Sequence, residues 1–486
     1  MNCAIARLGE RLVLALPERG MPIIVSAFSA AGFNDAGLND LLRRAGRVNG
    51  MDVAAPSAVY LPTGGHGNFG WPAIAGHRDG KNFTFHPAGW TILESTDSAL
   101  KLAATDHSAE LAITLRFKLS SVLAMCAELK NLGATPYVLD RCMAGTVLIP
   151  GTPKNYVGFR GSWGREFHEC REPASRKLWV QENRRGRTSH DRFPAVAIES
   201  QNAMGAQSVH AMHVGWSGNH VIAIDPTDDG RVLLHGGELF EPGEMILQPG
   251  ATYASPTVYA AEEAYGDAYD LWPKFHAAVR NDVVTWPGGK MRPRPVTLNT
   301  WEGNYCDHRI DALKAQATAA ADLGIERFVL DDGWFGLRDD DTSSLGDWFI
   351  DKRKYPDGLG PLVDHVISVG MELGIWFEPE MVNRNSDLYR KHPDWVLKID
   401  GQPLLESRHQ MVLDLTRREV SDYLFKSMDD LLRAYEIAYI KWDMNRDITH
   451  AGGSAGRAAT SRQTHAVYAL MDRLRDGTLV VTPGDR

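Results

Sequence analysis

The sequence predicts a multidomain protein of class β plus α/β, in which an antiparallel β sandwich precedes a parallel (β/α) barrel. Three observations predict it. Up to about residue 270, apolar and polar side chains alternate mostly with a period of two. Residues 286–295 are rich in Pro and Gly and interrupt the chain. From residue 296 onward, short apolar segments alternate with helical ones, as in a parallel sheet. We therefore expect a β domain over 1–285, a linker over 286–295 and an α/β domain over 296–486.

Composition and charge restrict the partners. The chain has 486 residues and a formal net charge of −9, so nothing in its composition indicates a surface that binds polyanions, and nucleic acid and anionic membranes are not expected as partners. No apolar run approaches the about 20 residues of a membrane span, and the N-terminus lacks a signal-peptide pattern. Five cysteines without paired spacing predict neither a zinc site nor a disulfide framework, and they favour a reducing, cytoplasmic location.

In the first domain we expect short antiparallel strands bounded by turn residues. Ile113–Leu119 alternates cleanly, and Val221–Ile224 and Val232–Leu234 are further apolar runs. Val122–Leu132 is expected to interrupt them as a helix. The Gly-rich segment Leu61–Pro72 fits no phosphate-binding pattern, so it is either an ordered surface loop or an aromatic contribution to a sugar site or subunit interface.

In the second domain, strands and helices are expected to alternate. The expected strands are Val296–Trp301, Arg327–Leu330, Gly374–Glu380, Met411–Leu415 and a fifth that ends at Asp443. The expected helices are Asp307–Leu323, closed by Gly324, then Leu359–Met371 and Arg418–Tyr435.

Charged and aromatic residues stand at the ends of these strands, where a (β/α) barrel carries its chemistry. They are Trp301, Asp331, Asp332, Trp376, Glu378, Glu380, Arg408, Lys441, Asp443 and Asn445. A single carboxylate at a strand end is more often a helix cap or a solvated group, but five successive strand ends of this kind indicate a site. Carboxylates accept hydrogen bonds from hydroxyl groups, indoles stack on sugar rings, and one carboxylate can attack a glycosidic carbon. We predict a sugar site in which Asp443 is the nucleophile and Lys441, on the same strand face, keeps it ionised.

Several motifs resemble those of glycoside hydrolase family 36 α-galactosidases. They are Asn299–Glu302, Val329–Gly336, Trp376–Met381 and, above all, Lys441–Asn445. The loop around His66 and Trp71, and Gly161–Trp163, resemble the N-terminal β-supersandwich domain of that family. The resemblance covers nearly the whole chain. It implies a β-supersandwich followed by a (β/α)8 barrel, and retaining hydrolysis of terminal α-galactosides such as melibiose and raffinose-type oligosaccharides.

The resemblance also implies roles for individual residues. Asp443 falls on the nucleophile, and Asp331 and Asp332 fall on the carboxylates that hold the 4- and 6-hydroxyls of the sugar. Further sugar-binding positions are Trp376, Arg408, Lys441, Asn445, Trp301 and Trp71. Family members are commonly homo-oligomers, in which the loop Asn68–Trp71 would reach a neighbour's site. No metal or cofactor is implied.

Near its end the sequence departs from the family pattern. The general acid/base Asp of the family follows a Cys-x-x-Gly-Gly loop after strand six, whereas here the chain reads Leu479–Arg486 and the loop is absent. Asp485 stands near the place, but its surroundings do not match. We therefore expect an incomplete barrel of about five to six strands, truncated before its end, with no general acid/base and impaired turnover. The alternatives are a non-catalytic galactoside-binding or subunit protein, and a related α-N-acetylgalactosaminidase or α-galactosyltransferase.

Overall fold

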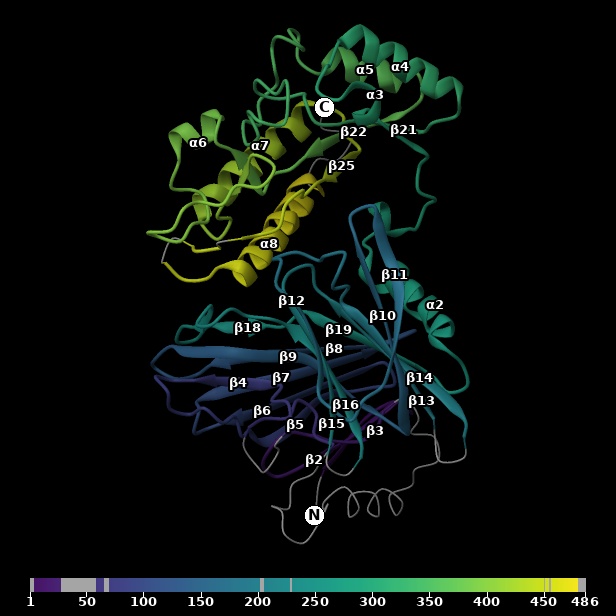
Figure 1. Cartoon of the computed structure of the whole chain (residues 1–486), viewed down its shortest axis with the longest axis vertical. Coiled ribbons are helices and arrows are strands. Elements are labelled where there is room, and N and C mark those ends of the chain that lie inside the picture. Colours follow the sequence, from purple (N-terminus) through teal and green to yellow (C-terminus); the bar gives the residue numbers. More distant parts are fainter. Residues whose placement is uncertain are drawn as a thin grey trace. The chain divides into compact units, whose positions relative to one another are not determined.

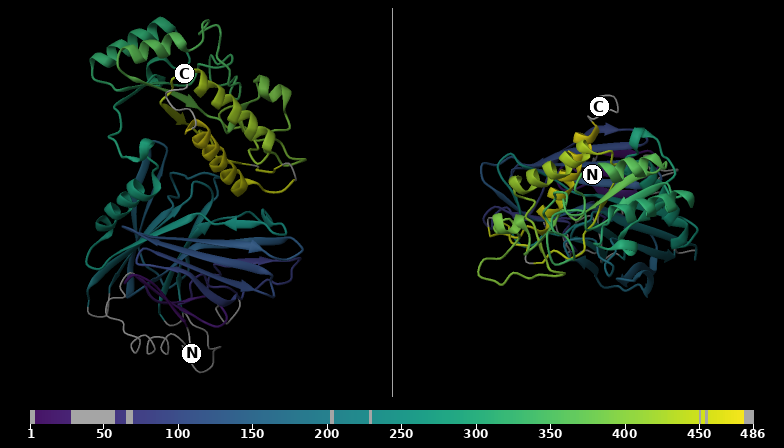
Figure 2. Two further views of the ribbon diagram at one scale, coloured as in Figure 1. Left: turned by 180° about the vertical axis from the view of Figure 1, so that it is seen from behind. Right: turned by 90° about the horizontal axis from the view of Figure 1, so that it is seen from above.

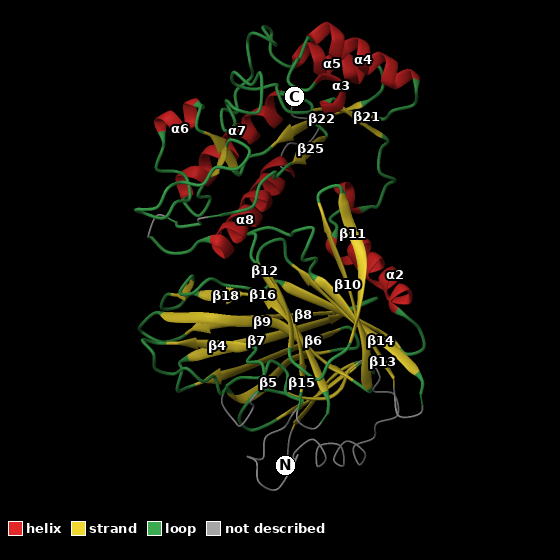
Figure 3. Cartoon of the chain, viewed as in Figure 1, coloured by secondary structure: helices red, strands yellow, loops and turns green. Residues whose placement is uncertain are grey.

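A computed structural model describes residues 4–27, 58–64, 70–201, 205–227, 230–449, 451–453 and 456–479. The chain divides into two compact units, Met1–Gly289 and Lys290–Arg486. The division falls within the Pro- and Gly-rich stretch 286–295. Strands dominate the first unit, and most of the helices belong to the second (Figure 3).

The described residues of the first unit form three antiparallel sheets. The smallest joins β1 (Ala4–Leu8), β2 (Leu12–Leu16) and β3 (Ile23–Ala27). In the largest sheet, neighbouring strands follow one another in the order β11 (Arg165–Pro173), β10 (Thr152–Ser162), β13 (Ala195–Gln201), β14 (Gln207–Gly215), β19 (Thr257–Glu263), β8 (Leu123–Asn131), β7 (Leu111–Leu119), β6 (Ala99–Asp106) and β5 (Ala88–Ser95). Strand β18 (Thr252–Ala254) also pairs with β8. In the third sheet, neighbouring strands follow one another in the order β12 (Trp179–Asn183), β15 (His220–Pro226), β16 (Val232–Glu238), β9 (Tyr137–Ile149) and β17 (Met245–Leu247). Strand β4 (Ile74–His77) also pairs with β9.

Figure 1 labels these strands. The burial of every second side chain along a strand explains how they pack. In β7 the buried residues are Leu111, Ile113, Leu115 and Phe117, so one face of the strand enters the core. That core includes side chains from both large sheets, as in a sandwich. The expected helix over Val122–Leu132 is wrong, because the segment forms β8 and also buries every second residue.

The first unit ends in helical segments. Helix α2 (Ala268–Ala278) starts with a capping box between Asp267 and Asp270, which satisfies backbone N–H groups at its first turn. A π-helical turn (Val279–Val283) and a 3₁₀ turn (Pro287–Gly289) follow.

The second unit contains a parallel sheet of four strands in sequential order, β20 (Thr297–Asn299), β21 (Arg327–Leu330), β22 (Glu372–Phe377) and β25 (Tyr439–Trp442). The expected fourth barrel strand, Met411–Leu415, is wrong. Met411 and Val412 fall instead in β24 (Gln410–Val412), which pairs antiparallel with β23 (Met381–Asn383) in a separate two-stranded sheet, and Leu413 and Leu415 lie beyond that strand. The strand that ends before Asp443 is therefore the fourth of the parallel sheet among the described residues.

Six helices of the described chain accompany this sheet: α3 (Trp301–Asn304), α4 (Ile310–Asp322), α5 (Gly360–Ser368), α6 (Asp387–Lys391), α7 (Arg418–Ala434) and α8 (Thr460–Leu479). Helix α7 buries Val420, Leu424, Met428 and Leu431, an apolar stripe at helical spacing that enters the core of the second unit. Helices α4 and α5 lie side by side, as do α7 and α8 (Figure 2). No helix of the described residues is long and apolar enough to cross a membrane.

Candidate active site

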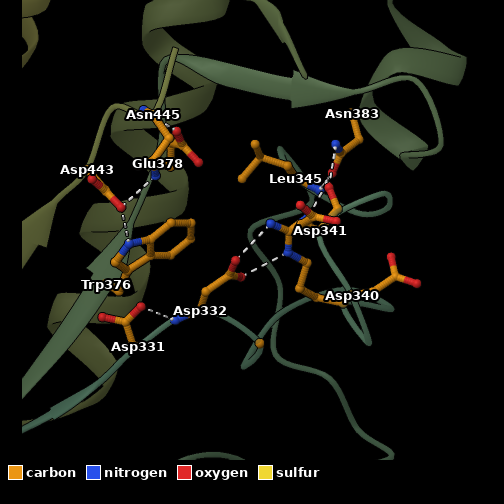
Figure 4. A network of polar contacts seen from close by, with 12 residues as sticks. Asp331, Asp332, Asp340, Asp341, Leu345, Trp376, Glu378, Asn383, Asp443 and Asn445 are labelled. Atoms are coloured by element: carbon orange, nitrogen blue, oxygen red, sulfur yellow. Dashed lines mark hydrogen bonds and ion pairs between the residues drawn. The ribbon is translucent and has the colours of Figure 1, made fainter. Parts of the chain in front are cut away.

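Carboxylates gather where the parallel strands end. Asp331 and Asp332 follow β21, Glu378 follows β22, and Asp443 follows β25. Because these strands are parallel neighbours, their carboxyl ends meet at one edge of the sheet. Figure 4 shows these four side chains around the indole of Trp376.

Asp443 is held by three hydrogen bonds to its carboxylate. Its Oδ2 accepts from Nε1 of Trp376 at 3.0 Å and from Nδ2 of Asn445 at 2.7 Å. Its Oδ1 accepts from the backbone N–H of Met444 at 3.0 Å. The backbone N–H of Asp443 donates to the carbonyl of Phe377 at 2.8 Å, which ties the residue to the end of β22. The plane of this carboxylate is thus fixed by groups from two neighbouring strands.

Asp331 forms an ion pair with Lys441. The two groups are 2.8 Å apart, and Nδ2 of Asn299 also donates to Oδ2 of Asp331. The structure therefore adds an ion-pair partner for Lys441 that the sequence did not predict. That Lys441 also keeps the carboxylate of Asp443 ionised stays a prediction.

Asp332 is paired with Arg338, a residue that is only 1% exposed. Its guanidinium donates from Nε to Oδ1 at 2.9 Å and from Nη2 to Oδ2 at 2.7 Å, a bidentate geometry. The remaining nitrogen donates to Asn383 and to the carbonyl of Ser343. Burial raises the pKa of Asp332, and the hydrogen bonds and charge of Arg338 oppose that rise.

Two buried glutamates, one of them Glu378 of the cluster, have raised pKa values. Burial raises the pKa of Glu378 to about 7; the Asn445 backbone hydrogen bond lowers it and the charge of Asp443 raises it. Burial also raises the pKa of Glu380 to about 7, against the hydrogen bond that its Oε1 accepts from Nε1 of Trp442 at 3.1 Å. Two carboxyl groups whose protonation changes near neutral pH therefore lie beside the strand ends.

Known proteins of one family match this chain along most of its length. The family described as "Glycosyl hydrolase family 36 N-terminal domain" matches residues 33–248, and the family "Melibiase" matches residues 252–479. The crystal structure of the family 36 α-galactosidase AgaA from Geobacillus stearothermophilus superposes with a TM-score of 0.86 at 30% identity, over 97% of this chain and 70% of that one. The chain belongs to glycoside hydrolase family 36.

Curated relatives agree with this assignment. An α-galactosidase of Escherichia coli is 40% identical over 430 residues, which is 88% of this chain and 60% of the relative. AgaA is 35% identical over 388 residues, which is 79% of this chain and 53% of that enzyme. The chain thus spans between half and two thirds of the length of these two family 36 relatives.

The predicted sugar-binding residues of this family 36 chain differ in how far they are buried and in which side chains they contact. Trp376 is buried, with its ring parallel to that of Phe335 at 6.0 Å. Trp301 is the first residue of α3, and its ring packs edge to face against that of Tyr305 with the ring centroids 5.1 Å apart. Arg408 is exposed in the turn before β24, with a positive φ of 54°.

Other predicted positions lie elsewhere. Trp71 belongs to the first unit, where the guanidinium of Arg141 stacks on its ring at 4.3 Å. His66, Asn68 and Asp485 lie outside the described residues. In the parts of the chain that the structure describes, no group of three or more His, Cys, Asp or Glu side chains is arranged to hold a metal.

Sequence reasoning missed the groups that support the cluster. Arg338 precedes three aspartates, a run that is typical of a solvated surface, so nothing in the sequence marked it as buried. Asn383 and Gln410 stand beside apolar residues in short strands, and a polar residue in such a run was the one available signal. Lys354 donates to the carbonyls of Cys306, Gly333 and Arg338 at 2.8, 2.9 and 2.6 Å and so joins the loops that follow β20 and β21.

Proposed function

We propose that this chain hydrolyses terminal α-galactosides, such as melibiose and raffinose-type oligosaccharides, by double displacement at Asp443. The observation that carries the proposal is the carboxylate of Asp443, fixed by Trp376 and Asn445 at a strand end beside Asp331 and Lys441. Relatives named as α-galactosidases support the substrate class, and a variant of AgaA, 29% identical to this chain, has been crystallised in complex with raffinose.

The chemistry requires one carboxylate to act as a nucleophile. In the first step an oxygen of Asp443 bonds to the anomeric carbon while the bond to the leaving oxygen breaks, and that oxygen takes up a proton from solvent water. Water then cleaves the glycosyl ester, which releases galactose with its configuration retained and restores the carboxylate. Because three hydrogen bonds orient the Asp443 carboxylate before substrate arrives, little reorganisation is needed for attack.

The surrounding residues would bind the sugar. Asp331 and Asp332 are proposed to accept hydrogen bonds from its 4- and 6-hydroxyls. Lys441 and Asn445 can donate hydrogen bonds, and Trp376 offers an aromatic face. Arg408, Trp301 and Trp71 remain proposed contacts, Trp71 by way of a neighbouring subunit in a homo-oligomer.

A reducing, cytoplasmic setting is proposed on the state of the cysteines. Cys126, Cys142, Cys170 and Cys306 are free thiols, and Cys142 and Cys306 are buried. Burial raises the pKa of Cys306 to about 11, which keeps that thiol protonated and unreactive at neutral pH.

The test is hydrolysis of an aryl α-galactoside by the purified protein and by an Asp443→Asn variant. An activated aryl leaving group needs little help from a proton donor, so turnover or a burst depends mainly on the nucleophile. We expect Asp443→Asn to lower the rate by about 10³-fold or more. Asp364→Asn, on the exposed face of α5, is the matched control and should retain the rate. Equal rates for Asp443→Asn and the unchanged protein would refute the proposal, as would galactose binding without any hydrolysis.

A further inference from the structure

Glu378 is enclosed beside the proposed nucleophile and has both carboxylate oxygens engaged. The residue as a whole is 1% exposed. Its Oε1 accepts from the backbone N–H of Asn445 at 2.7 Å, and its Oε2 accepts from Nε2 of Gln410 at 2.9 Å. A carboxylate so enclosed is suited to holding protein groups in place.

Asn445 connects Glu378 to Asp443. Its backbone N–H is bound by Glu378, and its side-chain Nδ2 donates to Oδ2 of Asp443 at 2.7 Å. The same oxygen of Asp443 accepts from Trp376, so two donors converge on it (Figure 4). Fixing the backbone of Asn445 therefore fixes one of the two donors that orient Oδ2.

We propose that Glu378 is a positioning residue for Asp443, acting through Asn445. It holds the Asn445 backbone so that the Asn445 amide and the Trp376 indole set the plane of the Asp443 carboxylate. Only the description of Asp443 as a nucleophile rests on the proposed function. The hydrogen-bonded relay itself stands on the distances above.

A change in the protonation of Glu378 should alter the hydrogen bonds that link it through Asn445 to Asp443. The charged groups that act on it are Asp443 and Asp332, with Arg338 opposing them, and its pKa is raised to about 7. A charged acceptor binds an N–H group more strongly than a neutral one, so protonation weakens the hold on Asn445. Gln410 can follow the change, because its buried Oε1 has no hydrogen-bond partner among the described residues and, once the amide turns, can accept a hydrogen bond from the protonated Glu378 carboxyl group.

The indole N–H resonances of ¹⁵N-labelled tryptophan test the relay without any need for turnover. Trp376→Phe and Trp442→Phe assign the two relevant signals, and Asp443→Asn shows how the Trp376 signal responds to a changed acceptor. We expect Glu378→Gln to shift the Trp376 signal. Glu380→Gln, the matched buried control that contacts Trp442, should shift only the Trp442 signal.

A double-mutant comparison separates the relay from a direct effect of charge. In an Asn445→Ala background, which keeps the backbone N–H but removes the amide, Glu378→Gln should produce no further shift of the Trp376 signal. In the unchanged protein that signal should titrate with a midpoint about pH 7, and the titration should disappear in Asn445→Ala and persist in Glu380→Gln. A titration that persists in Asn445→Ala would overturn the proposal, even if Glu378→Gln could not be folded.

Covalent labelling by 5-fluoro-α-D-galactosyl fluoride gives the functional measure. Asp443 bonds to the anomeric carbon and fluoride leaves with the electron pair, so no proton donor is required. We expect Glu378→Gln to lower the labelling rate constant about 10- to 100-fold while galactose affinity changes less than about threefold. Equal losses of both would show a general structural role and overturn the inference. Failure to label the unchanged protein would refute the proposed function alone, because the tryptophan signals still decide the relay.

Discussion

At the scale of single residues, the ion pair between Asp332 and Arg338 is buried and depends on both partners. Asp332 and Arg338 are both buried, so removing the cation leaves a carboxylate that neither water nor protein neutralises. We expect Arg338→Met to lower the free energy of unfolding by about 3–5 kcal/mol at pH 8. The folded-state pKa of Asp332 is already raised and would rise further without Arg338, so the folded variant binds protons more tightly than the unfolded chain. The loss should therefore be smaller at pH 5 than at pH 8.

Urea unfolding at the two pH values measures this effect. The double variant Asp332→Asn with Arg338→Met is the control, because it removes the buried charge and should recover part of the loss and its pH dependence. Equal destabilisation of Arg338→Met at pH 5 and pH 8 would contradict the explanation.

At this scale, the sequence predicted which residues would meet but not how they would pair. Asp331, Asp332, Trp376, Asp443 and Asn445 come together because parallel strands deliver their ends to one edge. The pairing depends on the path of the chain after each strand, as the ion pair of Lys441 with Asp331 shows. Periodicity carries no information about that path.

At the scale of elements, the turn Ser407–Gln410 is strained. Arg408 and His409 have φ values of 54° and 58°, a region that side chains other than glycine adopt at a cost. His409 is exposed, and its backbone carbonyl accepts from Nδ2 of Asn383 at 2.7 Å, an interaction that glycine would keep. We expect His409→Gly to raise the free energy of unfolding by about 1 kcal/mol. Denaturant titration measures the free energy of unfolding, which His409→Ala should not raise. An increase with alanine as large as that with glycine would refute the explanation by backbone strain.

The errors at this scale have a physical cause. Ala, Met, Glu, Leu and Lys fill β8, and these residues favour helices, but the segment lies between β7 and β19 in a large sheet and the packing there overrides local preference. Residues Met411–Leu415 form an apolar run typical of a barrel strand. Such a run does not distinguish parallel from antiparallel pairing, and here the partner is β23.

For the whole molecule, the division at Gly289/Lys290 predicts a single preferred site of tryptic cleavage in the segment 286–295. Lys290, Arg292 and Arg294 are exposed, but proline follows both arginines and blocks trypsin there. We expect brief digestion to yield a fragment that begins at Met291, and Lys290→Gln to abolish it. N-terminal sequencing of the fragments identifies the cut. Survival of the peptide bond after Lys290 in an otherwise digested protein would argue against an accessible boundary between the units.

The three carbonyls bound by Lys354 have a consequence for the chemical reactivity of the protein surface. An amine is acylated through its free electron pair, whereas all three N–H donors of this ammonium are engaged by backbone oxygens and Asp339 lies 3.3 Å away. Reagents such as activated esters should therefore modify the exposed neighbour Lys352 and spare Lys354 while the second unit is folded. Acylation of Lys354 would then show that the loops that follow β20 and β21 have opened. The residue is thus a chemical probe of whether those loops keep their folded conformation.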